Sequence, residues 1–124
     1  MIRNIVLATL FSSIGLFGQS SGQTWTGFLV NADCYAREEH NTRPLDRDVD
    51  HDRDYEVRVC APSATTKSFS IIDRDGQRLN LDPTGNAKAA DLVRRITRKG
   101  EIEVSVTGTR KGEVLQLDSI AARQ

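Results

Sequence analysis

The stretch Ser68-Phe-Ser-Ile-Ile-Asp-Arg-Asp-Gly-Gln-Arg-Leu-Asn-Leu81 decides the fold. Apolar side chains dominate both of its ends, and they flank the dipeptide Asp75-Gly76. An Asp-Gly pair between two such runs is a strong signal for a β-hairpin turn. The stretch therefore predicts two paired strands, at 68–72 and 77–81, in the centre of a β-rich domain.

A helix is predicted directly after this hairpin, at about residues 86–98. Pro83 breaks the strand, Asn86 is a favourable N-cap residue, and Gly100 follows a basic last turn. Apolar residues recur at helical spacing along one face, namely Ala89, Val93 and Ile96 with Leu92 beside them. Amides at a helix start can receive an anion, but we interpret Gly85-Asn86 as a simple cap.

Three further strands are predicted outside this centre. They cover residues 24–30, 101–107 and 113–120, the last two being joined by a turn at 109–112. Five strands with one helix between strands 3 and 4 is the element order of the OB-fold, a small Greek-key barrel. The prediction is a mainly β, five-stranded OB-fold-like barrel that forms one domain over residues 23–124.

Several segments resemble those of small exported bacterial proteins of unassigned function that are thought to be OB-like. The second half is also similar to the bacterial periplasmic OB-fold family, in which a Phe-x-x-x-Asp-x-x-Gly hairpin precedes the helix. The resemblance implies the fold and the compartment but no catalytic residue, because the shared positions are mainly core and turn positions. The segments are Thr26-Gly-Phe-Leu-Val-Asn-Ala-Asp-Cys34, Phe69-Ser-Ile-Ile-Asp-Arg-Asp-Gly76, Leu79-Asn-Leu-Asp82, Gly85-Asn-Ala-Lys-Ala-Ala90 and Val104-Ser-Val-Thr-Gly108.

The N-terminus reads as a cleaved secretory signal over residues 1–22. Arg3 precedes the uncharged apolar run 5–17, which is shorter than the roughly 20 residues that a transmembrane helix needs. Small residues fit cleavage after Ser20 or after Gly22. The alternative is a buried N-terminal helix of the domain. We expect a periplasmic or secreted protein without a transmembrane anchor.

Composition and cysteine content agree with a small exported domain. The chain has 17 basic and 17 acidic residues, so loss of Arg3 with the signal leaves a net charge of −1. This balance argues against binding to nucleic acid, which depends on basic charge. Cys34 and Cys60 are the two cysteines, and in an oxidising compartment they are expected to form a disulfide. The alternative is a pair of free thiols with a redox or metal function.

An almost wholly polar, acidic segment lies between the first two strands, at about 35–54, and is predicted to be a long loop. Acidic residues occupy every second position at its end: Asp46, Asp48, Asp50, Asp52, Asp54 and Glu56. In an extended chain these six carboxylates project from one face. A hard cation such as calcium would neutralise that face, although the pattern fails the EF-hand test.

The alternative interpretation of this carboxylate row is a solvated loop rim. Four arginines within residues 43–58 neutralise much of the acidic charge locally, and we favour this interpretation. His40 and His51 raise the question of a zinc site, since imidazole and carboxylate are common zinc ligands. Two histidines eleven residues apart in a polar loop are more often simply exposed.

The sequence holds no recognisable catalytic set or phosphate-binding loop. We therefore expect an exported, non-enzymatic binding or interaction module without a cofactor, and a calcium-responsive module is the alternative. OB-folds usually bind ligands between the loop after strand one and the loop that joins strands four and five. Arg110 and Lys111 lie in that last turn and are the candidate ligand-face residues, for a protein or a small molecule.

Overall fold

The computed structural model describes residues 22–42, 49–96 and 100–123. These residues form five strands and three helices, in the order β1 (Gln23–Asn31), α1 (Ala32–Thr42), α2 (Val49–Val59), β2 (Phe69–Ile72), β3 (Arg78–Leu81), α3 (Pro83–Arg95), β4 (Ile102–Lys111) and β5 (Val114–Ala122). Residues 1–21, which hold nearly all of the predicted signal peptide, lie outside the described part. None of the helices described is long and apolar enough to cross a membrane.

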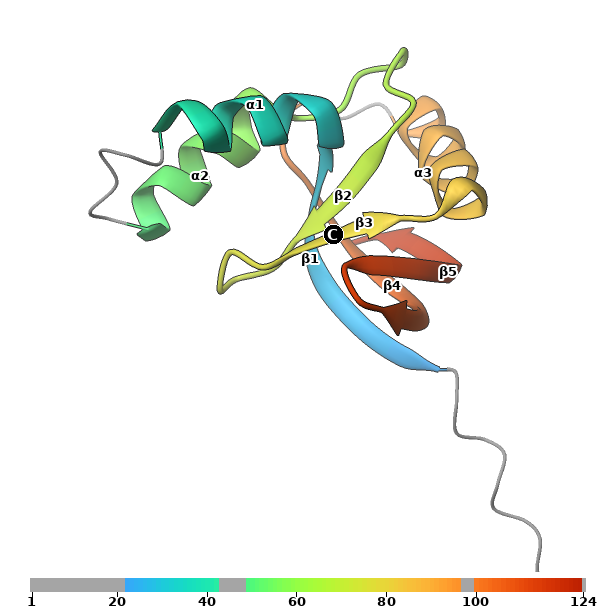
Figure 1. The fold of residues 1–124 in the computed structure, drawn as a ribbon. Coiled ribbons are helices and arrows are strands. Elements are labelled where there is room, and N and C mark those ends of the chain that lie inside the picture. Colours follow the sequence, from blue (N-terminus) through green and yellow to red (C-terminus); the bar gives the residue numbers. More distant parts are fainter. Residues whose placement is uncertain (1–21, 43–48, 97–99, 124) are drawn as a thin grey trace, which may run out of the picture.

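The strands close into a barrel in the order β1-β2-β3-β5-β4 (Figure 1). Long strand β1 closes it, because its first part pairs with β4 and its last part pairs with β2. All neighbours are antiparallel except β3 and β5, which run parallel. The predicted OB-fold-like barrel, mainly β and with a helix between β3 and β4, is confirmed.

The barrel interior is filled by alternate side chains of the strands. Ile102, Val104 and Val106 of β4 point inward as their spacing predicts, and each is at most 2 % exposed. Members of this core from other elements include Leu29, Phe69, Ile71, Leu79, Leu81, Ala89, Leu92, Leu115 and Leu117. A second, smaller cluster lies under α1 and α2 and consists of Val30, Tyr35, Val57, Cys60 and Ile72.

The β2–β3 hairpin forms at the predicted Asp-Gly dipeptide. The Asp73 amide donates to the Gln77 carbonyl at 3.0 Å, and the Gly76 amide donates to the Asp73 carbonyl at 3.0 Å. Gly76 adopts a φ of 83°, a left-handed conformation that glycine takes without steric strain. The turn thus fixes the register in which Ile71 faces Leu79.

Helix α3 begins earlier than predicted, at Pro83, and its N-cap is Asp82 rather than Asn86. The Asp82 carboxylate accepts a hydrogen bond from the Gly85 amide at 2.9 Å, and proline is well suited to the first helical position. Asn86 instead accepts a hydrogen bond from the Phe69 amide at 2.9 Å, which links α3 to the start of β2. The amides at Gly85 and Asn86 both donate to Asp82, as expected for a cap.

The predicted polar loop at 35–54 is wrong, because α1 and α2 occupy most of it. The prediction assumed that a segment so polar has no core to form. The helices need very little core, since they bury Tyr35 and Val57 against Val30 and Ile72 on the outside of the barrel. Figure 1 shows α1 and α2 side by side on one side of the barrel, and α3 on the other.

Candidate ligand-binding site

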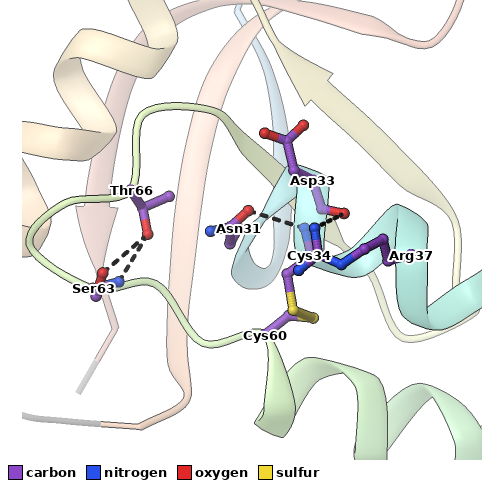
Figure 2. The surroundings of a disulfide bond; sticks show 7 residues. All are labelled: Asn31, Asp33, Cys34, Arg37, Cys60, Ser63 and Thr66. Carbon is purple, nitrogen blue, oxygen red and sulfur yellow. Dashed lines mark hydrogen bonds between the residues drawn. A yellow bond between two sulfur atoms is a disulfide. The ribbon is translucent and has the colours of Figure 1, made fainter.

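The segment that carries α1 and α2 is fixed to the barrel at its base (Figure 2). Cys34 of α1 and Cys60, which follows α2, form the predicted disulfide, with their Cα atoms 5.5 Å apart. Asn31 caps α1 by accepting a hydrogen bond from the Cys34 amide at 3.0 Å. The Asn31 amide in turn donates to the Cys60 carbonyl at 2.9 Å. The start of α1 and the residue that follows α2 are therefore held next to each other at the end of β1.

A buried polar cluster joins the two helices to β3. Tyr35 and Glu56 are 2 % and 4 % exposed, and their side chains share a hydrogen bond. Arg78 of β3 lies 6.0 Å from the centre of the Tyr35 ring and pairs with Glu39 of α1 at 3.1 Å. Burial, followed by the carboxylates of Glu56 and Glu39, raises the pKa of Tyr35 far above its usual value. The phenol therefore stays protonated and donates to Glu56, which holds α1 against α2.

The carboxylate row does not form the single face that was predicted. That face requires an extended chain up to Glu56, whereas residues 49–59 are helical. Alternate residues of an α-helix are separated by about 200° around its axis, so a period of two distributes side chains around the helix. Asp54 pairs with Arg53 at 3.0 Å, and Glu56 is buried against Tyr35.

The remaining predicted metal ligands cannot be placed. Asp46 and Asp48 lie outside the described residues. The same holds for the side chains of Asp50, Asp52, His40 and His51. Among the side chains that the structure does describe, no group of three or more His, Cys, Asp or Glu could hold a metal ion. Calcium binding by this segment therefore stays a prediction.

The predicted ligand face holds a small polar cleft of about 260 Å³. It lies between α1, the β2–β3 turn and the β4–β5 turn, and its lining residues are Glu39, Gly76, Gln77, Arg78, Arg110 and Glu113. Arg110 lines this cleft, and its Nε donates to the Gly112 carbonyl at 2.7 Å. Lys111 is exposed but is not part of the lining. Two carboxylates and two arginines balance the charge here, and the volume is below the usual range for small-molecule sites.

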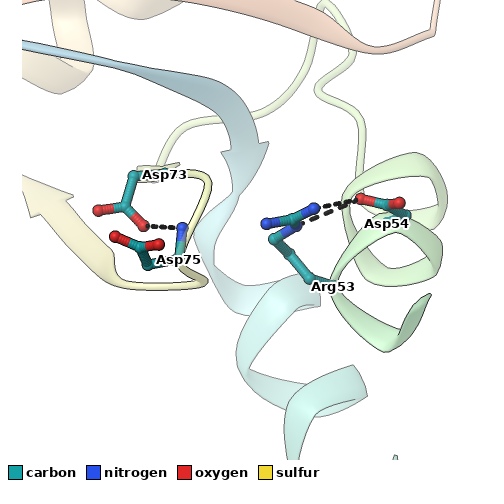
Figure 3. Close-up of polar contacts among 4 residues, drawn as sticks. All are labelled: Arg53, Asp54, Asp73 and Asp75. Atoms are coloured by element: carbon teal, nitrogen blue, oxygen red, sulfur yellow. Dashed lines mark hydrogen bonds and ion pairs between the residues drawn. The ribbon is translucent and has the colours of Figure 1, made fainter. Parts of the chain in front are cut away.

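A second polar cleft, of about 610 Å³, lies between α2, β1 and the β2–β3 turn. Figure 3 shows Arg53 and Asp54 on its α2 side and Asp73 and Asp75 on the turn. Asp73 already accepts hydrogen bonds from two amides of its own turn, at 2.9 and 2.8 Å. Since three arginines and four carboxylates line this cleft, and Arg53 pairs with Asp54, its charge selects no sign of ligand.

A third hollow is a groove between α3 and the chain that joins α2 to β2. Two adjoining cavities of about 530 and 800 Å³ make up this α3 groove, and they share Ala64 and Arg94 in their lining. On the α3 side the lining includes Pro83, Asn86, Ala87, Ala90, Val93, Arg94 and Ile96. On the opposite side it includes Arg58, Val59, Ala61, Pro62, Ser63, Ala64, Thr65, Thr66 and Lys67.

The walls of the α3 groove are tied in place. The loop wall contains a turn in which the Ser63 amide donates to the Thr66 hydroxyl at 2.9 Å (Figure 2). Thr66 is buried, and its amide donates to the Ser63 carbonyl at 3.1 Å. The bond from the Phe69 amide to Asn86 connects the end of this wall to α3. The groove is therefore formed before any ligand arrives, which is typical of small-molecule sites.

Comparison with family models, curated proteins and solved structures finds no match for this chain. The resemblance to exported OB-like proteins thus stays an expectation. Sequence reasoning missed the α3 groove, because nothing local pairs residues 61–67 with α3. A signal did exist in α3 itself: Ala87, Ala90 and Arg94 recur at helical spacing on a face beside the predicted core face.

Proposed function

We propose that this protein is an exported, non-enzymatic binding module that holds a small ligand in the α3 groove. The observation that carries the proposal is the groove itself: each of its two cavities has a volume in the usual range for small-molecule sites, and apolar surface exceeds polar surface in both linings. The disulfide and the predicted signal peptide support export. A closed barrel with hydrogen-bonded loops also offers a rigid support for such a site.

An uncharged apolar probe tests binding without any assumption about ligand charge. We expect decanol, added to ¹⁵N-labelled protein in an NMR titration, to shift the amides of Ala64, Ala87 and Ala90 in a saturable way. Burial of each methylene contributes about 0.8 kcal/mol, so hexanol should bind markedly more weakly than decanol.

A matched pair of variants locates the probe. Ala87→Glu places a charge in the α3 groove at an exposed helix position and should abolish the decanol shifts. Arg110→Ala alters the small cleft at the predicted OB ligand face and should leave them unchanged. Shifts confined to the neighbourhood of Arg110, or no saturable shift with any alcohol, would contradict a small-molecule site in the groove.

A further inference from the structure

The α3 groove differs from the other two clefts in charge. Three cationic side chains line it, Arg58, Lys67 and Arg94, and its described lining includes no Asp or Glu. The clefts beside Arg110 and Arg53 instead combine basic side chains with carboxylates. An apolar surface bordered by charge of one sign favours a ligand that has an apolar part and the opposite charge.

Arg94 is the cation best placed to receive a charged group, since it borders both cavities. Its guanidinium lies 3.9 Å from the Asp91 carboxylate, at the limit of an ion pair, whereas Arg95 approaches the same carboxylate to 3.0 Å. Asp91 is thus bonded more closely to Arg95 than to Arg94. Arg58 lies 5.8 Å from the centre of the Tyr55 ring, a contact that does not neutralise its positive charge.

The walls favour a small molecule over a peptide strand. A peptide that adds to a sheet needs an open strand edge, but α3 and a loop form the long walls. Ile102, the β4 residue in the lining, belongs to a strand already paired with β1. Apolar side chains such as Val59, which is 45 % exposed, are available to an alkyl chain instead.

We propose that the ligand of the α3 groove is a small amphipathic anion, with an apolar chain in the cavities and one negatively charged head group at Arg94, Lys67 or Arg58. This inference rests on the proposed function, because it names the class of ligand that the same groove holds. It predicts that charge and chain length contribute separately to affinity.

Three probes with the same chain separate these contributions: decanoate and decyltrimethylammonium, each below its micelle concentration, and decanol, below its solubility limit. Isothermal titration should give decanoate an affinity about fivefold higher than that of decanol, and decyltrimethylammonium the lowest affinity. Added salt should weaken decanoate binding and leave decanol binding unchanged. Shortening decanoate by one methylene should weaken it by about fourfold if that group is buried.

An exposed arginine outside the groove provides the matched control. Arg94→Gln should weaken decanoate binding by about threefold without affecting decanol, whereas Arg37→Gln, on the exposed surface of α1 and outside the lining, should change neither. If Arg94→Gln fails to fold, as judged by circular dichroism, Lys67→Gln in the loop wall serves the same purpose. Equal affinities of the three probes, or an unchanged affinity for decanoate in the folded groove variant, would overturn the anionic ligand and leave groove binding intact.

Two other results would overturn the proposal in different ways. Failure of all three probes to shift the groove amides would refute the proposed function together with this inference. Groove amides that shift with protein concentration alone, with a dimer in analytical ultracentrifugation, would identify a second copy of the chain as the occupant.

Discussion

Replacing Asp82 by alanine should destabilise the protein more than replacing Asp73, although each carboxylate accepts hydrogen bonds from two backbone amides. Asp82 Oδ1 accepts from Gly85 at 2.9 Å and from Leu117 at 3.2 Å, in partly buried surroundings. It thereby caps α3 and ties the helix to β5. Asp73 Oδ1 accepts from two amides within an exposed turn.

The difference in burial sets the expected magnitudes. Loss of the cap costs about 1 kcal/mol, and the partly buried Leu117 amide left without an acceptor adds about 1–3 kcal/mol. Asp82→Ala should therefore lower the free energy of unfolding by about 2–4 kcal/mol. Water replaces both lost bonds in Asp73→Ala, so that variant should lose less than about 1 kcal/mol.

Urea unfolding followed by Trp25 fluorescence measures both losses, because Trp25 packs against the barrel core. Asp82→Asn keeps an acceptor oxygen at the cap and should lose less than Asp82→Ala. Equal losses in the two alanine variants would refute the reasoning, since they would mean that the link from α3 to β5 contributes nothing measurable.

Three further predictions concern the segment between β1 and β2. Replacing Cys34 and Cys60 by alanine opens a loop with a sequence separation of 26 and should lower unfolding free energy by about 3–4 kcal/mol in urea melts, and dithiothreitol should then have no further effect. Because folding raises the pKa of Tyr35, the contribution of this residue to the free energy of unfolding is complete below about pH 10 and falls by about 1.4 kcal/mol per pH unit above it. Tyr35→Phe should remove this alkaline slope in pH-dependent melts. An unchanged slope would contradict its assignment to Tyr35. The two interpretations of the acidic segment predict different results in isothermal titration with calcium: a cation site would bind with a Kd of about 10⁻⁴ to 10⁻³ M and lose this binding in the triple variant Asp48→Asn, Asp50→Asn, Asp52→Asn, whereas the solvated rim that we favour should give no heat.

The barrel was predictable because its signals are local. Alternation at Ile102, Val104 and Val106 identifies β4, and Asp75-Gly76 identifies the hairpin. In β4 the apolar residues show directly which face is buried. The order of these elements then leaves few topologies, and the OB-like order is the one that the structure adopts.

Helices α1 and α2 could not be recognised in the same way, since tertiary contacts stabilise them more than their own pattern does. Tyr35 and Val57 supply most of their core, and the Cys34–Cys60 bond holds the bases of the helices together. The aspartates occur at every second position, as residues on one face of an extended strand do, and this alternation led to the wrong prediction. Asn31, an N-cap followed by an acidic first turn, was the available signal for α1, and it comes directly after the predicted strand 24–30.

The candidate site also combines residues that local sequence signals identify with residues that only tertiary contacts bring together. Arg110 could be singled out because it lies near the end of β4, beside a turn whose position OB topology fixes, and its role in ligand binding stays a prediction. The α3 groove depends on how residues 61–67 pass beside α3, and no short-range pattern encodes that approach. Eight of its eighteen lining residues are alanine, proline or valine, which in isolation read as ordinary loop or helix positions.

The chain leaves the barrel and returns to it at a single rung of the β1–β2 ladder, where Asn31 faces Phe69. The Ala32 amide also donates to the Ser68 carbonyl at 2.9 Å, so the exit and the return are bonded to each other. An excursion with such closely spaced ends can change in length or content while the strands on either side keep their register. Residues 32–67 can therefore be replaced as a unit by a short turn or by a foreign recognition loop. Such a replacement would remove the small cluster around Val30 and Ile72 and leave the interior of the barrel unchanged.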